Sequence, residues 1–333
     1  MDLIPAVRAP EFKDITGWAN SEPLSMRGLK GKVVLIDCWT YTCIFCLRTI
    51  PIMRRLQQKY GNYGLQVIEA HSAEYQFATD HDNIRRALLR YNINDVPVPF
   101  DTNNKTWEAF GNMYWPKHIL IDHNGLIRYE HAGYGGMEDF EDAVVELIED
   151  AGKKLDEGRE QDNPNDEIYD TYGMHFYGIA PEICVGYSRL RRFGNNQTLK
   201  PEAMNVMVDP GLHDSNVVYL RGRWIWQREG VQFSPGGKDQ NTAIMMKYNS
   251  AKRVHGIMGT SDGKPGKVEI KLDGNYLTKE QLGKDTKIED GISIANIQWP
   301  FIHNLIRADN PETGEIEIIP RSGNLVFYTF VFG

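Results

Sequence analysis

Residues 1–150 alternate between segments with two kinds of hydrophobic pattern, one typical of buried strands and one typical of helices. The runs KVVLIDCW and LQVIEAHS are almost continuously apolar, which is typical of strands that are buried on both faces of a sheet. Other segments repeat their apolar positions with the spacing of an amphipathic helix. Strands are therefore predicted at 32–39 and 65–72, and helices at 46–61, 82–93 and 137–155.

A hairpin is predicted before the last of these helices. Residues 117–131 hold two short apolar runs that meet at Asn124-Gly125, and both of these residues tolerate a positive φ. The order strand, helix, strand, helix, hairpin, helix predicts an α/β sheet with an antiparallel edge pair.

The pattern changes twice further along the chain. Residues 151–175 are polar, lack an apolar period and contain Asn163-Pro164-Asn165, which predicts a linker. From 176 to 333 the apolar runs are short and are separated by Gly, Asp, Asn and Pro, with separate strands expected at 242–250 and 253–260. This pattern predicts an all-β sandwich of the jelly-roll kind, so the first domain covers 1–150 and the second covers 176–333.

Composition narrows the functional classes. Of the 333 residues, 41% are hydrophobic and 25% are charged, and the net charge is -8, which fits a globular protein and disfavours a nucleic-acid partner. No apolar run reaches the roughly 18 residues that a membrane span requires. The first residues lack a basic stretch followed by an apolar one, so a cytoplasmic protein is expected, or an extracytoplasmic one if an export signal has been removed.

The cysteines indicate the chemistry. Only four cysteines are present, which excludes a disulfide-rich scaffold. Cys43 and Cys46 form a CxxC pair, which either ligates a metal or makes and breaks a disulfide. Since the sequence has no second CxxC and no HxxxH, neither a metal nor a cofactor is expected. Cys38 and Cys184 are expected to be buried, inert thiols, with a regulatory or intermolecular disulfide as the alternative.

The expected position of the pair indicates how it reacts. Cys43 ends the turn between the first strand and the first helix, where free backbone N–H groups and the helix dipole stabilise a thiolate. Cys46 lies three residues further on, and Cβ atoms at that spacing are about 5–6 Å apart, close to the roughly 4 Å of a disulfide. We therefore predict Cys43 as the nucleophile and Cys46 as the resolving thiol, with an apolar approach over Ile44 and Phe45.

An aspartate interrupts the apolar run that precedes the pair. Burying Asp37 costs roughly several kcal/mol unless the carboxyl group has a partner, so an aspartate at this position indicates either a partner or a functional role. Its strand leads under the cysteine helix, so a carboxylate with a raised pKa is placed to take the proton of Cys46. The alternative is an aspartate that a backbone donor or a lysine satisfies.

Together these residues resemble a thioredoxin-fold protein of the TlpA/ResA-like, redoxin-type branch. The resemblance rests on APEF, on LKGKVVLIDCW, on the CxxC pair and on Pro51, and it covers roughly residues 9–150. The segment WTYTCIFC departs from thioredoxins, because Thr42 precedes the first cysteine and Ile44-Phe45 stands in place of Gly-Pro.

The resemblance implies further site residues. NMYWPKHILID matches the place of the family's cis-proline, so a cis bond is expected between Trp115 and Pro116, next to main-chain groups that bind an extended substrate peptide. It also implies that Trp39 and Trp115 flank the dithiol, with core packing as the alternative. Glu74 follows the second strand and is implied as a second proton-relay group, or else as a solvated loop carboxylate.

The domain order resembles DipZ-type proteins, in which a TlpA-like domain precedes a carbohydrate-binding-module-like jelly roll. The resemblance implies a separate electron donor or acceptor, since no membrane segment is expected in this chain. Trp224, Trp226 and Trp299 are candidates for stacking on a glycan at the β-sandwich, although a sandwich core is the simpler interpretation.

These observations predict a thiol–disulfide oxidoreductase with an α/β thioredoxin fold followed by an all-β jelly-roll sandwich. Its expected partners are protein disulfides or dithiols, and neither nucleic acid nor a membrane span. Two alternatives stay open. A thiol peroxidase fits Thr40 but meets Ile36 where a proline is required, and a glycan- or protein-binding module would leave the dithiol idle.

Overall fold

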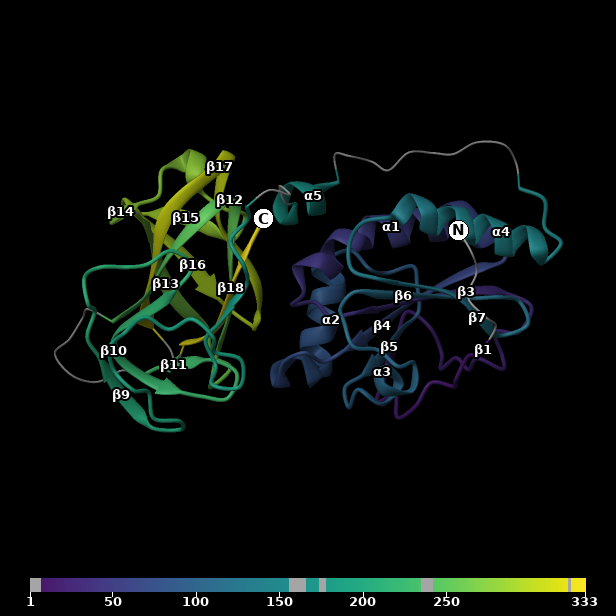
Figure 1. Cartoon of the computed structure of the whole chain (residues 1–333), viewed down its shortest axis with the longest axis horizontal. Helices are drawn as coiled ribbons and strands as arrows, with labels where there is room; N and C mark the ends of the chain where they lie inside the picture. Colours follow the sequence, from purple (N-terminus) through teal and green to yellow (C-terminus); the bar gives the residue numbers. More distant parts are fainter. Residues whose placement is uncertain (1–6, 156–165, 174–177, 235–241, 323–324) are drawn as a thin grey trace. The chain divides into compact units, whose positions relative to one another are not determined.

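The chain folds into two compact units. A computed structural model describes residues 7–155, 166–173, 178–234, 242–322 and 325–333. We call the part from Met1 to Tyr169 unit 1 and the part from Asp170 to Gly333 unit 2 (Figure 1).

The segment predicted as a linker, 151–175, contains one element that the sequence did not predict. Its Asn163-Pro164-Asn165 triplet lies outside the described residues. Glu167–Tyr172 forms the short helix α5. The Oδ1 of Asp166 accepts a hydrogen bond from the amide of Ile168 over 2.9 Å, which is the capping interaction that starts a helix without an apolar period.

Unit 1 is built on a seven-stranded sheet with the order β1-β7-β6-β3-β4-β5-β2. The strands are β1 (Val7–Arg8), β2 (Trp18–Ala19), β3 (Val33–Trp39), β4 (Leu65–Ser72), β5 (Val98–Asp101), β6 (Lys117–Ile121) and β7 (Leu126–Ala132). The helices are α1 (Ile44–Tyr60), α2 (His81–Arg90), α3 (Lys105–Ala109) and α4 (Met137–Asp150), with 3-10 turns at Gly61–Tyr63 and Gln76–Thr79. β3 is parallel to β4 and antiparallel to β6, so the predicted thioredoxin fold is confirmed.

The elements around the cysteine pair begin and end close to where the sequence places them. α1 contains Pro51 and ends at its C-cap, Gly61. β6 and β7 form the predicted hairpin, in which Gly125 has a φ of 82°. The Oδ1 of Asp122 accepts hydrogen bonds from the amides of Asn124 and Leu126 and so holds the turn in place.

Alternation along β3 gives the sheet two different faces. Val34, Ile36 and Cys38 belong to an apolar cluster that also contains Phe110, which follows α3. Asp37 points to the opposite face, because successive side chains of a strand alternate. Figure 1 shows α1 and α4 over one face of the sheet and α3 on the other. The cysteine helix therefore covers the face that carries Asp37.

Apart from the end of α5 and one 3-10 turn, the described part of unit 2 is all-β, as predicted, and its strands form one eleven-stranded sheet. The path through the sheet is β15-β16-β13-β17-β12-β10-β11-β18-β8, with β14 paired to β13 and β9 paired to β10. The strands are β8 (Ile183–Cys184), β9 (Met204–Met207), β10 (Val218–Trp226), β11 (Val231–Phe233), β12 (Ala243–Thr260), β13 (Gly266–Leu272), β14 (Asn275–Tyr276), β15 (Thr286–Glu289), β16 (Ile292–Ile297), β17 (Phe301–Ser322) and β18 (Leu325–Phe332). A 3-10 turn at Lys279–Gln281 completes the unit.

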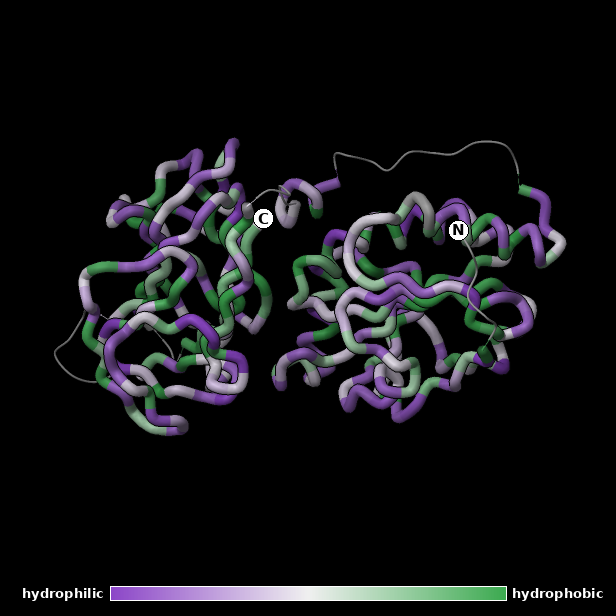
Figure 2. The backbone as a smooth tube through the Cα atoms, in the orientation of Figure 1, coloured by the Kyte–Doolittle hydropathy of each residue, from purple (hydrophilic) through white to green (hydrophobic). Residues whose placement is uncertain are grey.

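The strands that were predicted separately at 242–250 and 253–260 are one strand, β12. Ser250 has a φ of 49°, and register shifts on either side of Ala251 bend the strand without ending its pairing with β17. The first residues of β12 pair with β10 and its last residues pair with β18, so the sheet folds around one apolar core. β18 is apolar at most positions, LVFYTFVF, and buried at all but one. Figure 2 shows hydrophobic and hydrophilic stretches interspersed along the backbone of both units.

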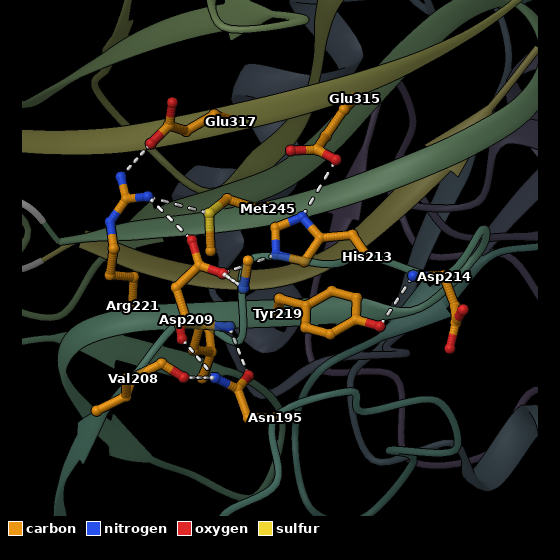
Figure 3. A network of polar contacts seen from close by, with 12 residues as sticks. Asn195, Val208, Asp209, His213, Asp214, Tyr219, Arg221, Met245, Glu315 and Glu317 are labelled. Atoms are coloured by element: carbon orange, nitrogen blue, oxygen red, sulfur yellow. Dashed lines mark hydrogen bonds and ion pairs between the residues drawn. The ribbon is translucent and has the colours of Figure 1, made fainter.

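A network of charged side chains fastens the segment between β9 and β10 to the sheet (Figure 3). The Nε2 of His213 lies 2.9 Å from the Oδ1 of Asp209, and its Nδ1 lies 3.1 Å from the Oε2 of Glu315. Arg221 pairs with Asp209 over 3.2 Å and also with Glu317. We call these five residues the polar clasp.

Candidate active site

Cys43 stands at the start of α1. Its backbone is extended, with φ -91° and ψ 112°, and the helix begins at the next residue. The Sγ of Cys43 accepts a hydrogen bond from the amide of Cys46 over 3.3 Å. The sulfur therefore occupies the place of a capping oxygen, where unpaired amides and the helix dipole favour an anion.

Cys46 lies behind Cys43 and differs from it in accessibility. Its side chain is fully buried, whereas Cys43 is partly exposed, and both are free thiols. Burial, followed by the hydrogen bond with Cys43, raises the pKa of Cys46 well above its usual value, and the charge of Asp37 acts in the same direction. The pair thus combines one sulfur that solvent can reach with one that keeps its hydrogen until an acceptor takes it.

Three ionisable side chains form a row on the sheet face beneath α1. Asp37 on β3 pairs in register with Glu69 on β4 and with His118 on β6. Their exposed fractions are 0%, 2% and 0%, respectively. The Nε2 of His118 lies 3.4 Å from the Oδ1 of Asp37. We call these three residues the buried row.

Burial sets the protonation states in this row. It raises the pKa of Asp37 to about 7, and a hydrogen bond with Glu69 limits that rise. Burial, with the neighbouring charge of Asp37, raises the pKa of Glu69 well above its usual value. Burial, helped by His131, lowers the pKa of His118 to about 3. At neutral pH, His118 is therefore neutral and Asp37 is close to its midpoint, and burial favours the protonated form of Glu69.

Glu74, the acidic residue implied after the second strand, is attached to the loop that carries the dithiol. The Oγ1 of Thr42, which directly precedes Cys43, donates a hydrogen bond to the Oε2 of Glu74 over 2.8 Å. Glu74 is thus partly exposed and held next to the residue that precedes Cys43, whereas Asp37 is fully buried.

Arg48 is an additional charged residue near the nucleophile. Its guanidinium carbon lies 5.3 Å from the ring centroid of Phe45 and 6.0 Å from that of Tyr134. The residue is 1% exposed. Burial lowers the pKa of Arg48 to about 10, and the negative fields of Tyr134 and Cys43 oppose this change. Arg48 thus places a buried positive charge that interacts electrostatically with Cys43.

The residues expected to bind substrate are not all accessible. Trp39 is fully buried and donates from Nε1 to the backbone oxygen of Glu69 over 3.2 Å, and Ile44 is 4% exposed. Phe45 is 41% exposed. Of the two side chains of the predicted apolar approach, Ile44 and Phe45, only that of Phe45 is exposed, and Trp39 packs in the core as the alternative interpretation had it.

The expected cis bond between Trp115 and Pro116 is present. Pro116 precedes β6, whose first residue, Lys117, pairs with Cys38 near the end of β3. This places the Trp115–Pro116 segment at the sheet edge from which the cysteine loop departs. The Nε1 of Trp115 donates to the Oγ of Ser72 over 3.1 Å.

Glu69, His118 and Arg48 are site residues that were not predicted from the amino-acid sequence. Glu69 had the same signal as Asp37, since it also interrupts an apolar strand, in LQVIEAHS. His118 becomes significant only through its register opposite Asp37. Arg48 carries no local signal, because its two aromatic neighbours come from different segments.

The remaining cysteines differ from each other. Cys38 is 2% exposed, and burial raises its pKa to about 12, in agreement with the expected inert thiol. Cys184 is partly exposed rather than buried, and its Sγ donates to the Oε1 of Glu182 over 3.7 Å. Among the described residues, no three His, Cys, Asp or Glu side chains are arranged to hold a metal ion. No helix in the same part of the chain has the length and hydrophobicity needed to cross a bilayer.

The three candidate tryptophans of unit 2 differ in burial. Trp224 is fully buried, so it cannot stack on a sugar ring, contrary to the candidate role. The Nε1 of Trp226 donates to the backbone oxygen of Val185 over 2.9 Å. Trp299 is half-buried and stacks on Phe301 with ring centroids 4.6 Å apart.

Comparisons with known proteins find one relative that matches nearly the whole chain and others that match less than half of it. Protein DipZ of Mycobacterium bovis is 30% identical over 330 residues, which cover 98% of this chain and 43% of DipZ, so the chain spans less than half the length of that relative. The thiol-disulfide oxidoreductase YkuV of Bacillus subtilis is 26% identical over 139 residues, or 42% of this chain and 93% of YkuV. A crystal structure of a putative thiol:disulfide interchange protein DsbE from Chlorobium tepidum is 23% identical, covers 43% of this chain and 96% of its own, and has a TM-score of 0.39.

Family models match both units separately. The model described as Redoxin matches residues 5–147, and the model described as thioredoxin like C-terminal domain matches residues 180–333. Each unit is therefore similar to a different family, the first to the redoxins and the second to the thioredoxin-like C-terminal domain.

Proposed function

We propose that the chain is a thiol–disulfide oxidoreductase whose unit 1 exchanges its dithiol with protein disulfides. In the reducing direction, the Cys43 thiolate attacks a substrate disulfide, which forms a mixed disulfide and releases one substrate thiolate. Cys46 then gives its proton to Asp37 and attacks the Cys43 sulfur. The Cys43–Cys46 disulfide forms, and the second substrate thiolate leaves. Two electrons pass to the substrate, and its thiolates take up the protons that the two cysteines released.

One observation carries this proposal. The partly exposed Sγ of Cys43 is hydrogen-bonded to the amide of Cys46, whose own sulfur is buried directly behind it. This arrangement favours capture by the first sulfur and delayed attack by the second. Among the relatives, YkuV is named a thiol-disulfide oxidoreductase, which supports the same chemistry.

The surrounding residues have proposed roles in substrate binding and proton transfer. Phe45 offers an apolar surface beside the nucleophile, and the Trp115–Pro116 segment lies at the same sheet edge. Glu74 is proposed as a second relay group, because it is hydrogen-bonded to the residue before Cys43. A separate donor supplies the electrons or a separate acceptor removes them. The identity of this partner depends on whether the protein is cytoplasmic or extracytoplasmic. The burial of Trp224 removes one of the arguments for a glycan at unit 2.

Trapping tests the exchange mechanism. In Cys46→Ala the mixed disulfide through Cys43 cannot be resolved, so substrate proteins accumulate as covalent adducts that mass spectrometry identifies after alkylation. Cys43→Ala is the matched control and forms no such adduct. Absence of any Cys43 adduct across a full redox titration would refute the proposal.

The alternatives give different outcomes in the same preparation. Rapid turnover of hydrogen peroxide through Cys43, without protein adducts, would identify a peroxidase. Failure of Cys43 and Cys46 to cycle between dithiol and disulfide would leave a binding module.

A further inference from the structure

Glu69 is a buried carboxyl group that the mechanism above does not use. It faces Asp37 from the neighbouring strand, and the two carboxyl groups are within hydrogen-bond reach of each other. Among the described residues, neither oxygen of Asp37 accepts a hydrogen bond from an amide, a hydroxyl or a charged N–H group, and the same is true of the Oε2 of Glu69. A buried carboxylate without any donor is costly. A hydrogen shared between the two groups removes that cost.

Other ionisable groups face this pair from the elements packed around it. They are His71 on β4, His118 on β6, Cys43, Cys46 and Arg54 at or on α1, and Asp95 before β5. Burial lowers the pKa of His71 and of His118 to about 3, so both imidazoles are neutral. Arg54 is engaged elsewhere, by Asp166 over 3.2 Å and by the backbone oxygen of Tyr91 over 3.0 Å.

We propose that Glu69 is a positioning residue that stays un-ionised and donates its carboxylic hydrogen to Asp37. The donated bond stabilises the Asp37 carboxylate, because the acceptor is the charged partner. Asp37 is then ionised near neutral pH and ready to receive the proton of Cys46. This inference rests on the proposed function, since an acceptor beneath Cys46 matters only if Cys46 must lose a proton.

The step that Glu69 supports is balanced without a further reagent. The hydrogen of Cys46 passes to an oxygen of Asp37, the new S–S bond joins Cys46 to Cys43, and the bond between Cys43 and the substrate breaks. The substrate sulfur leaves with the electron pair of that bond. Asp37 afterwards returns its proton to the solvent, and the proton of Glu69 stays in place throughout.

Two substitutions of Glu69 distinguish the effect of donating a hydrogen bond to Asp37 from the effect of filling the space beside it. Glu69→Gln keeps an N–H donor that can reach Asp37, whereas Glu69→Met has a similar length and no donor. Cys184 is replaced by serine (Cys184→Ser) in every protein tested, because its partly exposed thiol would also react. The reduced protein is mixed with the aromatic disulfide 5,5′-dithiobis(2-nitrobenzoate) in a stopped-flow instrument. The first thionitrobenzoate released reports capture by Cys43, and the second reports the attack of Cys46 on the mixed disulfide.

The expected result is specific to the second release. A hydrogen bond to a charged group contributes about 1.5–3 kcal/mol, or roughly one to two pKa units. In Glu69→Met the pH midpoint of the second release therefore rises by about one to two units, and its rate at pH 7 falls about tenfold. Glu69→Gln stays within about threefold of the unchanged protein. The first release keeps its rate in both variants.

Several results would overturn the inference. It is wrong if Glu69→Met leaves the midpoint of the second release unchanged, or if Glu69→Gln shifts it as far as Glu69→Met does. A loss of the first release in the unchanged protein would instead refute the proposed exchange function.

A direct measurement keeps the inference testable if Glu69→Met does not fold. The side-chain carboxyl ¹³C signal of Glu69, assigned by comparison with Glu69→Gln, is followed by NMR in the full chain. We expect it to keep the chemical shift of a protonated acid between about pH 5 and pH 8, beyond the range of an ordinary glutamate. Titration with an ordinary midpoint near pH 4 would refute the donation whatever the kinetics show.

Discussion

The buried row of unit 1 and the polar clasp of unit 2 are both clusters of ionisable side chains on a sheet, but their charges are satisfied in opposite ways. In the clasp, Asp209 meets His213 and Arg221. Burial tends to raise the pKa of Asp209, yet hydrogen bonds from the amide of Gly211 and from these two side chains outweigh it and lower the pKa. In the row, burial raises the pKa of Asp37 to about 7.

The difference separates two uses of buried charge. A carboxylate that meets cations gives up its proton at all ordinary pH values and serves to hold segments together. A carboxylate that meets another carboxyl group keeps a proton affinity near neutrality, which suits proton transfer. The clasp is therefore expected to contribute to stability alone, and the row to contribute to chemistry at a cost in stability.

The largest expected effect comes from Asp37→Asn. An amide cannot accept the proton of Cys46, so the second thionitrobenzoate release slows by about a hundredfold at pH 7, while the first release keeps its rate. Asp122→Asn is the matched control, because Asp122 is also buried but its carboxylate is held by two backbone amides. Equal kinetics in the two variants would remove the distinction between the row and satisfied carboxylates.

Asp37→Asn is expected to slow the reaction but to stabilise the folded protein at high pH. The folded pKa of Asp37, about 7, lies above its ordinary value of 3.8, so the folded state binds the proton more tightly than the unfolded state does. Its contribution to stability is complete below about pH 4 and is lost as the pH rises through 7. Asparagine does not titrate, so Asp37→Asn gains roughly 2–4 kcal/mol relative to the unchanged protein at pH 8–9 compared with pH 4. Urea unfolding at these two pH values measures the gain, and a pH-independent difference would contradict it.

Breaking the clasp tests the other side of the comparison. Arg221→Met removes the guanidinium that both Asp209 and Glu317 contact, which lowers the free energy of unfolding of unit 2 by about 1–2 kcal/mol after allowance for the partial exposure of these side chains. Both thionitrobenzoate releases stay unchanged. Lys264→Met, at an exposed turn of the same unit, serves as the control and has little effect. A change in dithiol kinetics in Arg221→Met would contradict a purely structural clasp.

The smallest expected effect concerns Arg48, the cation beside the nucleophile. Arg48→Met removes the positive charge that the Cys43 sulfur faces, so alkylation of Cys43 by iodoacetamide at pH 7 slows about threefold to tenfold. Arg48→Lys keeps the charge and recovers most of the rate. Equal slowing in both variants would show that the planar guanidinium packs between Phe45 and Tyr134 without acting on the sulfur.

Strong local patterns were sufficient to predict the frame of the site. β3 and β4 are continuous apolar runs, and α1 follows a CxxC pair, so the position of Cys43 at a helix start follows from the amino-acid sequence alone. β5 and α3 were not predicted. β5 contains Pro99, which weakens the sequence signal of a strand. α3 has only five residues, too few for a repeating helical pattern to be recognised in the sequence.

Register explains why part of the site escaped prediction. The sequence indicated that Asp37 is buried, but it did not indicate which side chains of β4 and β6 lie opposite. Glu69 and His118 become neighbours of Asp37 only through strand pairing, which is a long-range property. In unit 2, the same limitation concealed β12, because a bend at Ser250 resembles the end of one strand and the start of another.

The two faces of β3 have a consequence for the three thiols that lie within nine residues of each other, Cys38, Cys43 and Cys46. Because Cys38 points into the apolar cluster on the far side of the sheet, a layer of backbone separates it from the other two sulfurs. A mixed disulfide formed during turnover can therefore be resolved within the chain by Cys46 alone. The position of Cys38 prevents exchange with a third sulfur, in addition to the raised pKa of that thiol. A single fluorophore or cross-linker directed at unit 1 should accordingly mark one sulfur in the native protein and three only after unfolding.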